Sequence, residues 1–242
     1  MEKRLHALFV AADGTTLRRE DLKKARETAA LLDALGRVVG PGKLLVDAAA
    51  GKAYVGLLAV DLLGVDRLHA IERDPTRAAR CREAIARLGS RARIDVVEAD
   101  VADRAAWPPA PDVVVALHAC GAASDAVADA AVAAGARWIF LVPCCYAAAV
   151  AFSPKATAIA ERLGVPRQAE VRRRFIMSLI DSERTLRLEA AGWETTVVPL
   201  VPPTVTPHHL LWRARRVREP GRMQEAAVRL ERLRGGDVGA AT

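Results

Sequence analysis

The sequence has few aromatic residues, few cysteines and no long apolar run. Aromatic residues make up 4% of the 242 residues, whereas 52% are hydrophobic, so alanine, valine and leucine must supply most of the core. The four cysteines include an adjacent pair, which argues against a disulfide-stapled secreted fold and favours reduced thiols. No stretch reaches the run of about eighteen apolar residues that a membrane helix needs. We therefore expect a cytoplasmic protein with one large core and no membrane partner.

The excess of positive charge is the main feature of the ionisable residues. The formal net charge is +7, which favours polyanionic partners such as RNA. A basic surface without a binding role would give the same count. The charge therefore leaves the partner open.

Short apolar runs alternate with longer amphipathic stretches, a pattern typical of βαβ units. The apolar runs predict strands at 44–46, 68–71, 94–97, 113–117, 138–142, 195–198 and 209–215. The amphipathic stretches predict helices at 19–37, 54–63, 76–88, 123–134 and 168–190, and a basic helix from Glu219 onward. Because most of these strands are almost wholly apolar, we expect a parallel α/β sheet with helices on both faces.

We expect one sheet domain with a short extension at each end. Residues 1–40 should form an N-terminal helical extension, 41–216 the sheet domain, and 217–242 a C-terminal helix and tail. The helical spacing within 19–37 predicts one buried face, made of Leu22, Ala25, Ala29, Leu32 and Leu35.

The loop after the first strand is the first place to look for a cofactor, because nucleotide-type cofactors bind beyond the carboxyl ends of such strands. It reads Asp47-Ala48-Ala49-Ala50-Gly51-Lys52-Ala53-Tyr54. The usual methyltransferase spacing is D-x-G-x-G-x-G, of which only Gly51 remains, with alanines at the outer two positions. Small residues still let the backbone approach the methionine portion of S-adenosyl-L-methionine. We predict that Asp47, Ala49, Gly51 and Lys52 contact this cofactor.

Acidic residues follow the next two strands. Glu72 ends the second strand, 21 residues after Gly51, where a carboxylate accepts hydrogen bonds from ribose hydroxyls. Asp100 closes the third strand and can accept from an adenine amino group, with Val101 packing on the ring. The G-x-G-x-x-G spacing that a dinucleotide requires is absent, so NAD is disfavoured.

Three further motifs follow in order along the chain. They are Leu117-His118-Ala119-Cys120-Gly121, Pro143-Cys144-Cys145-Tyr146 and Thr206-Pro207-His208-His209-Leu210-Leu211. With D-x-x-x-G-K at Asp47, this set resembles a branch of class I methyltransferases that includes the eukaryotic tRNA acceptor-stem 2′-O-methyltransferases and many bacterial proteins. The resemblance covers about residues 20–216. It implies a Rossmann-like, mostly parallel seven-stranded sheet with the last strand antiparallel, and S-adenosyl-L-methionine as the cofactor.

The resemblance does not extend to the substrate. The tRNA enzymes carry a lysine at the position of Leu117 and a histidine pair at that of Tyr146-Ala147, and their zinc-binding segments have no counterpart in this sequence. His209 stands where relatives more often have asparagine. The acceptor is therefore open: it is RNA, or a small molecule or protein. A cofactor-binding module without catalysis would also account for the missing glycines.

Four residues after the fourth and fifth strands are candidates for catalysis: His118, Cys144, Cys145 and Tyr146. His118 is also expected to contact the cofactor. His118 can hold an acceptor hydroxyl or amine, take its proton, or bond to a neighbouring loop. The cysteines can be buried hydrophobes, or one can attack C6 of a pyrimidine, although the acidic residue that such enzymes place beside the strand-four cysteine is absent. Joined with Cys120, these groups offer soft metal ligands, but the spacing is not that of zinc sites, and we expect no structural metal. Tyr146 can also stack on a planar substrate.

The long helix at 168–190 carries the arginine run Arg172–Arg174 and, a few turns later, Asp181 and Arg184. These side chains can contact phosphates of an RNA ligand. Because arginine runs on amphipathic helices usually form a solvated face, we expect a solvated face in this helix.

Overall fold

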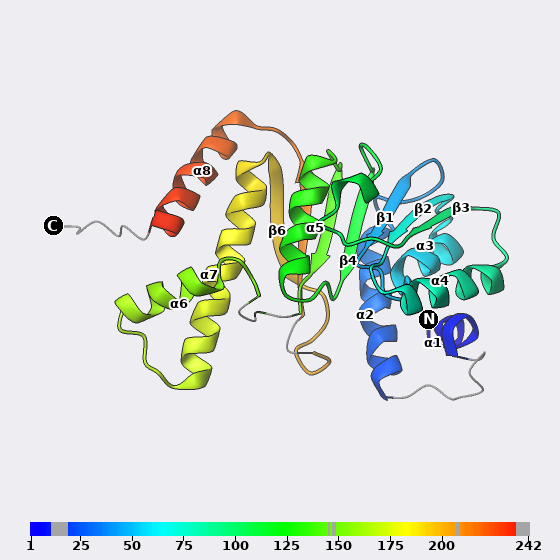
Figure 1. Ribbon diagram of the computed structural model, residues 1–242, viewed down its shortest axis with the longest axis horizontal. Helices are drawn as coiled ribbons and strands as arrows, with labels where there is room; N and C mark the ends of the chain where they lie inside the picture. Colours follow the sequence, from blue (N-terminus) through cyan, green and yellow to red (C-terminus); the bar gives the residue numbers. More distant parts are fainter. Residues whose placement is uncertain (11–18, 145, 147–148, 207–208, 236–242) are drawn as a thin grey trace.

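Seven strands form one sheet in the order β3-β2-β1-β4-β5-β7-β6 (Figure 1). The computed structural model describes the whole chain except residues 11–18, 145, 147–148, 207–208 and 236–242. The strands are β1 (Leu44–Ala48), β2 (Arg67–Ile71), β3 (Arg93–Val97), β4 (Val113–Leu117), β5 (Trp138–Val142), β6 (Trp193–Pro199) and β7 (Leu210–Arg216). β7 runs antiparallel to both β5 and β6, and the other pairs are parallel. The predicted fold class is confirmed.

Helices cover both faces of this sheet (Figure 1). They are α1 (Glu2–Leu5), the π-helical turn η1 (His6–Val10), α2 (Arg19–Leu35), α3 (Tyr54–Leu63), α4 (Pro75–Leu88), the 3-10 turn η3 (Arg104–Ala106), α5 (Ala122–Ala133), α6 (Ser153–Arg162), α7 (Ala169–Ala190) and α8 (Pro220–Gly235). None of the helices in the described part of the chain is long and apolar enough to cross a membrane. The domain boundaries expected near residues 40 and 216 stay a prediction.

The apolar strands follow from this two-sided cover. Along β4, Val113 and Val115 enter the core formed with α2, α3 and α4, whereas Val114 and Ala116 enter the core formed with α5 and α7. The first four residues of the strand are thus buried, which removes the alternation that a half-exposed strand would show, and only Leu117 at its end is partly exposed.

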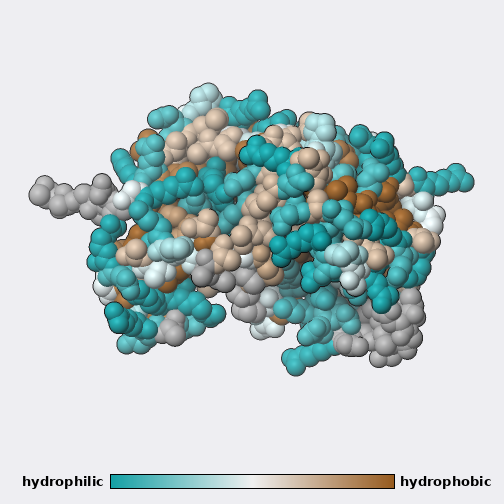
Figure 2. All heavy atoms as spheres, viewed as in Figure 1, coloured by the Kyte–Doolittle hydropathy of each residue, from teal (hydrophilic) through white to brown (hydrophobic). Residues whose placement is uncertain are grey.

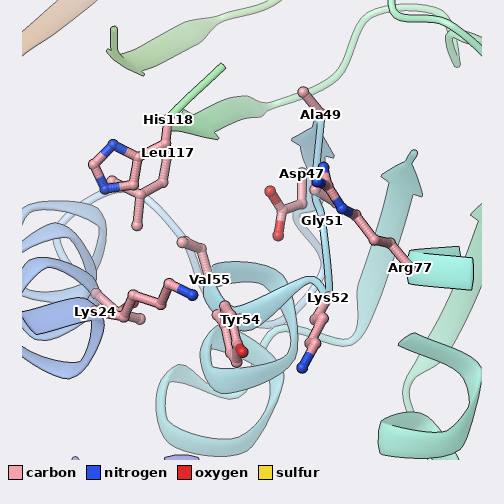
Figure 3. A pocket seen from close by; sticks show the side chains of 12 residues that line it. Lys24, Asp47, Ala49, Gly51, Lys52, Tyr54, Val55, Arg77, Leu117 and His118 are labelled. Carbon is pink, nitrogen blue, oxygen red and sulfur yellow. The ribbon is translucent and has the colours of Figure 1, made fainter. Parts of the chain in front are cut away.

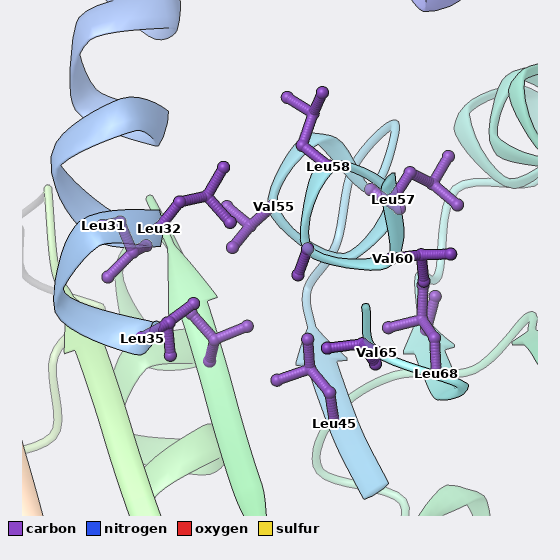
Figure 4. Close-up of a cluster of buried hydrophobic side chains, with 14 of the residues drawn as sticks. Leu31, Leu32, Leu35, Leu45, Val55, Leu57, Leu58, Val60, Val65 and Leu68 are labelled. Atoms are coloured by element: carbon purple, nitrogen blue, oxygen red, sulfur yellow. The ribbon is translucent and has the colours of Figure 1, made fainter. Parts of the chain in front are cut away.

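The buried face of α2 differs in part from the expected one. The helix buries Ala25, Leu32 and Leu35 as predicted, but Leu22 and Ala29 are only half-buried, and Glu27 and Thr28 lie inside instead. Figure 4 shows the reason: Leu32 and Leu35 point toward Val55 of α3 and Leu45 of β1. This contact with α3 sets the rotation of α2 and turns two polar residues toward the carboxyl edge of the sheet.

A buried arginine joins α7 to α5. Arg184 is fully buried, donating through Nε to Asp125 Oδ1 at 3.0 Å and through Nη1 to Asp181 Oδ1 at 3.4 Å. The expectation of a solvated face is therefore wrong for Arg184, because the sheet-facing side of α7 continues past the arginine run. Arg172 is also only partly exposed and pairs with Glu161 at 3.1 Å. Arg173 and Arg174 are exposed as expected, and each lies 2.9 Å from the Glu170 carboxylate.

α6 was not expected from the sequence. Its buried residues are few, and its apolar side chains form a separate small cluster with α7 rather than joining the sheet cores. In Figure 1, α6 and the amino-terminal half of α7 form a hairpin that extends past the sheet. The chemistry of this hairpin therefore depends on its exposed residues.

Candidate active site

Two hollows lie at the carboxyl edge of the sheet. The first, about 270 Å³, is lined by α2, by the loop between β1 and α3, and by the end of β4. The second, about 290 Å³, is lined by the ends of β2, β3 and β4. Ala49, Arg77 and His118 line both, so the two hollows lie side by side. They meet over β1, between β2 and β4, which is where the strand order reverses and where cofactors bind in such sheets.

The loop after β1 keeps the backbone of a glycine-rich turn although it contains two alanines in glycine positions. Ala49 has φ 53°, Gly51 has φ 61° and Ala53 has φ 55°. A left-handed backbone costs roughly 1–2 kcal/mol for a residue other than glycine. Hydrogen bonds hold the turn: Ala50 N–H donates to Ile71 O at 3.0 Å, and Gly51 N–H to Glu72 Oε2 at 2.7 Å. The predicted loop thus has the expected shape without the expected residues.

Asp47 is buried at the base of this loop. Its Oδ2 accepts a hydrogen bond from Gly56 N–H at 2.8 Å. Figure 3 shows the carboxylate turned from β1 toward Val55, at the first hollow. Burial raises the pKa of Asp47 to about 7, the Gly56 hydrogen bond opposes the shift, and the charge of Glu72 adds to it. A side chain at residue 56 would meet Leu68 at 2.7 Å, so only glycine lets α3 approach the carboxylate this closely.

Glu72 and Asp100 line the second hollow, as does Val101. Glu72 is nearly buried and ties two loops together, since Oε2 accepts from Gly51 N–H and Oε1 accepts from Asp74 N–H at 2.9 Å. Asp100 is more exposed; its Oδ1 accepts from Ala102 N–H at 2.9 Å and its Oδ2 lies 3.2 Å from Arg73 Nη1. The Ala102 hydrogen bond, followed by Arg73, lowers the pKa of Asp100. Both carboxylates keep lone pairs for a ligand.

His118 stands where the two hollows meet. Its backbone has φ 63°, and its N–H donates to Val142 O at 3.0 Å. Its imidazole Nε2 lies 2.8 Å from Oε2 of Glu27, a side chain that is 1% exposed. Sequence reasoning missed Glu27, because a glutamate in an amphipathic helix is ordinarily placed on the solvent side.

Other lining residues were also missed. Lys24 and Thr28 come from α2, and Arg77 comes from the first turn of α4. Thr28 Oγ1 is fully buried and has no hydrogen-bond partner in the part of the chain that is described. Buried hydroxyls are ordinarily satisfied, so this atom is suited to meet a ligand. Lys24 and Thr28 reach the hollow because of the rotation of α2, which the sequence pattern does not indicate.

The predicted cysteines and Tyr146 are placed differently from one another. Cys120 is exposed and lines the second hollow. Cys144 and Tyr146 line neither hollow, and Cys145 lies outside the described residues. Tyr146 packs against the α6–α7 cluster, and its hydroxyl donates to Asp181 Oδ2 at 3.1 Å. Burial and the neighbouring Asp181 raise the pKa of this phenol. Among the residues that the structure describes, no group of three His, Cys, Asp or Glu side chains is placed to hold a metal ion.

Comparison with known families decides the class of this protein. A family model described as a methyltransferase domain matches residues 22–151, which is more than half of the chain. The chain belongs to this methyltransferase family. No curated protein matches its sequence.

Solved structures with TM-scores above 0.5 share the fold of this methyltransferase. Magnesium protoporphyrin IX methyltransferase from Synechocystis PCC 6803, with bound S-adenosylhomocysteine, has a TM-score of 0.55 and 13% identity, over 89% of this chain and 94% of that one. The methyltransferase domain of bacterial CtHen1 has a TM-score of 0.52 and 10% identity, over 80% and 99%. M. capricolum TrmK, in complex with S-adenosylhomocysteine, has a TM-score of 0.43 and 9% identity over 76% of this chain, which spans only 65% of that protein.

S-adenosylhomocysteine, the demethylated form of the cofactor expected from the sequence, is bound in the Synechocystis enzyme. The residues at the two hollows fit this cofactor. The loop backbone and Thr28 line the first hollow, and carboxylates with free lone pairs line the second. S-adenosyl-L-methionine has an amino-acid end and a nucleoside end, and each end requires polar groups of the protein.

The left-handed alanines generate a first prediction. Ala49→Gly should leave the free energy of unfolding unchanged or raise it by up to about 1 kcal/mol, because relief of the strained φ offsets the larger entropy of the unfolded chain. Ala50→Gly, at a neighbour without positive φ, should lower it by about 0.5–1 kcal/mol. Urea unfolding of both variants measures the difference. Equal losses in the two variants would contradict the strain argument.

The raised pKa of Asp47 generates a second prediction. The folded protein keeps the Asp47 proton up to about pH 7, whereas the unfolded chain releases it near pH 3.8. The contribution of this proton to the free energy of unfolding is therefore complete below pH 4 and is lost as the pH rises to 7. The asparagine of Asp47→Asn does not ionise, so the free energy of unfolding of this variant should rise relative to that of wild type by roughly 2–4 kcal/mol between pH 4 and pH 8. Denaturant unfolding across this range measures it. Asp33→Asn, exposed on α2, is the control. A stability difference that does not change with pH would refute the assignment.

Proposed function

We propose that this methyltransferase holds S-adenosyl-L-methionine across the two adjacent hollows and methylates RNA. Asp47, Ala49, Gly51 and Lys52 would contact the methionine end in the first hollow. In the second hollow, Glu72 would accept hydrogen bonds from the ribose hydroxyls, and Asp100 and Val101 would hold the adenine. The observation that carries the cofactor assignment is that two adjacent hollows, which share Ala49, Arg77 and His118, lie at the strand-order reversal.

The cofactor supplies a methyl group on a positively charged sulfur, and the protein's task is to align an acceptor with it. Lys24 and Lys52 are available to the carboxylate of the methionine end, since both line the first hollow. The Lys24 ammonium lies 5.8 Å from the centre of the Tyr54 ring, which holds it at the entrance. His118, at the junction of the hollows, is the group suited to face the acceptor, and Cys144 and Tyr146 lie outside the hollows.

The surface around the site supports RNA as the acceptor. The α6–α7 hairpin carries many cations and few carboxylates: Lys155, Arg162, Arg167, Arg172, Arg173 and Arg174 against Glu161 and Glu170. It extends past the same edge of the sheet as the amino-terminal half of α2, and hydrophilic side chains cover both (Figures 1 and 2). A polyanion laid across this edge would meet cations on both sides of the site.

A third prediction tests the cofactor site. Glu72→Ala should weaken binding of S-adenosyl-L-methionine at least about tenfold, because hydrogen bonds to a charged group are worth about 1.5–3 kcal/mol. Asp100→Ala should weaken it less, because this carboxylate is more exposed. Calorimetry measures the affinities, and circular dichroism verifies the fold of each variant.

Asp103→Ala is the matched control for Asp100→Ala. Asp103 makes a similar turn contact with Ala105 N–H at 3.0 Å but lines neither hollow. Its affinity should equal that of wild type. Unchanged affinity in both Glu72→Ala and Asp100→Ala would remove the proposed site.

A fourth prediction tests the acceptor. Wild-type protein should transfer labelled methyl groups to an RNA fraction rather than to protein or metabolite fractions of a cell extract. Its RNA affinity should fall steeply with salt, and the double variant Arg162→Ala, Arg173→Ala should reduce the slope of log affinity against log salt by about 2. Arg232→Ala, exposed on α8, is the control. Labelling confined to another fraction would assign a protein or small-molecule acceptor, and no labelling at all would favour a binding module.

A further inference from the structure

We propose that Glu27 is a positioning residue that makes His118 the proton acceptor of the reaction, and that the methylated atom is therefore a hydroxyl oxygen or an amine nitrogen. The inference rests on the proposed function. It assigns a role to Glu27 and narrows the acceptor chemistry. The supporting observations are the burial of Glu27, its single partner, the free nitrogen of His118 and the strained backbone of His118.

Glu27 is a buried carboxylate with one hydrogen-bond partner among the described residues, the imidazole of His118. It is 1% exposed in the middle of α2, and its Oε1 has no hydrogen-bond partner in the described part of the chain. Its Oε2 lies 2.8 Å from His118 Nε2. Burying a carboxylate with incomplete pairing is unfavourable, and an apolar residue would serve the core better. The contact with His118 is the best explanation for a glutamate at this buried position beside the ligand site.

The contact determines which nitrogen of His118 is available. A carboxylate only accepts hydrogen bonds, so Nε2 carries the proton and donates it to Glu27 Oε2. In the neutral ring Nδ1 is then a bare acceptor, and it has no hydrogen-bond partner among the residues that are described. His118 lines both hollows and its side chain is 28% exposed, so an entering molecule can reach it.

The backbone of His118 supports the same role. Its φ of 63° is unfavourable for a residue with a side chain, and β4 ends immediately before it. The strain persists because His118 N–H is bonded to Val142 O and the imidazole to Glu27. Strained residues of this kind concentrate at functional sites, where the surrounding structure over-determines them.

The proton transfer completes the methyl transfer. A lone pair on the acceptor oxygen or nitrogen forms the bond to the methyl carbon while the carbon–sulfur bond breaks, and its electron pair returns to sulfur. The acceptor proton passes to Nδ1 of His118, and the resulting imidazolium lies against the negative charge of Glu27. The proton then leaves to water. Methylation of a carbon atom activated by a cysteine would not need the Glu27–His118 pair.

Glu27→Gln removes the negative charge at residue 27 and keeps the size of the side chain. Glutamine can still accept from His118 Nε2–H, so a purely structural role would leave activity near wild type. If the charge stabilises the imidazolium, kcat should fall about 100-fold while KM for RNA and the affinity for S-adenosyl-L-methionine change less than about threefold. Asp33→Asn, exposed on the same helix, should have no effect.

Nitrogen NMR of histidine-labelled protein gives a readout that is independent of activity. The wild type should show His118 protonated at Nε2 in its neutral form, and Glu27→Gln should give a mixture of tautomers. A wild-type His118 protonated at Nδ1 would overturn the proposal. So would full activity of Glu27→Gln, or a methyl group found on carbon together with activity lost in Cys144→Ser. Absence of methyl transfer by wild type would instead refute the proposed function and leave the tautomer result intact.

Discussion

The structure depends on the backbone of the loop from Asp47 to Ala53, which turns three times through the left-handed region. Two of these turns are made by alanine, so the loop keeps its shape only because neighbouring groups hold it: Glu72 accepts from Gly51 N–H, and Ile71 O accepts from Ala50 N–H. The same turn places Gly56 N–H against the buried Asp47 carboxylate and starts α3 directly above β1. Because α3 is positioned in this way, the packing of α2 follows, and with it the composition of the first hollow.

The rotation of α2 is the second determinant of the site. Its apolar side chains pack on α3 and β1, so its polar residues Glu27 and Thr28 are carried inside toward the ends of β1 and β4. A helix outside the strand–helix repeat thereby supplies the partner of His118, an unpartnered hydroxyl and a lysine to one site. The methyltransferase family match begins at residue 22, inside this helix, so most of α2 belongs to the matched methyltransferase domain.

A network of buried charged and polar side chains joins α7 to α5 and to the segment after β5. Arg184 lies between Asp125 of α5 and Asp181 of α7, and Asp181 also accepts from the Tyr146 hydroxyl. Burial raises the pKa of Asp181 to about 6, with Tyr146 and Arg184 opposing the shift. Through this chain of contacts the segment after β5 is tied to α7, and α7 in turn carries the basic hairpin beyond the edge of the sheet. Tyr146 of the P-C-C-Y motif thus attaches α7 to the segment after β5. Its position close to the end of a strand did not indicate this role.

The sequence by itself determined the sheet. Apolar runs such as 113–117 and 138–142 and the turn residues between them are local features, and local sequence decides where such strands and helices begin and end. It also identified Asp47, Glu72 and Asp100 at three strand ends, because the carboxyl ends of parallel strands always meet at one edge. Only the tertiary structure decided the positions of Glu27, Thr28 and Tyr146. Whether a side chain on α2 faces water or the site depends on how that helix rotates against α3, and whether Tyr146 reaches the hollows depends on Asp181, 35 residues away. Such long-range packing leaves no periodic signal in the chain.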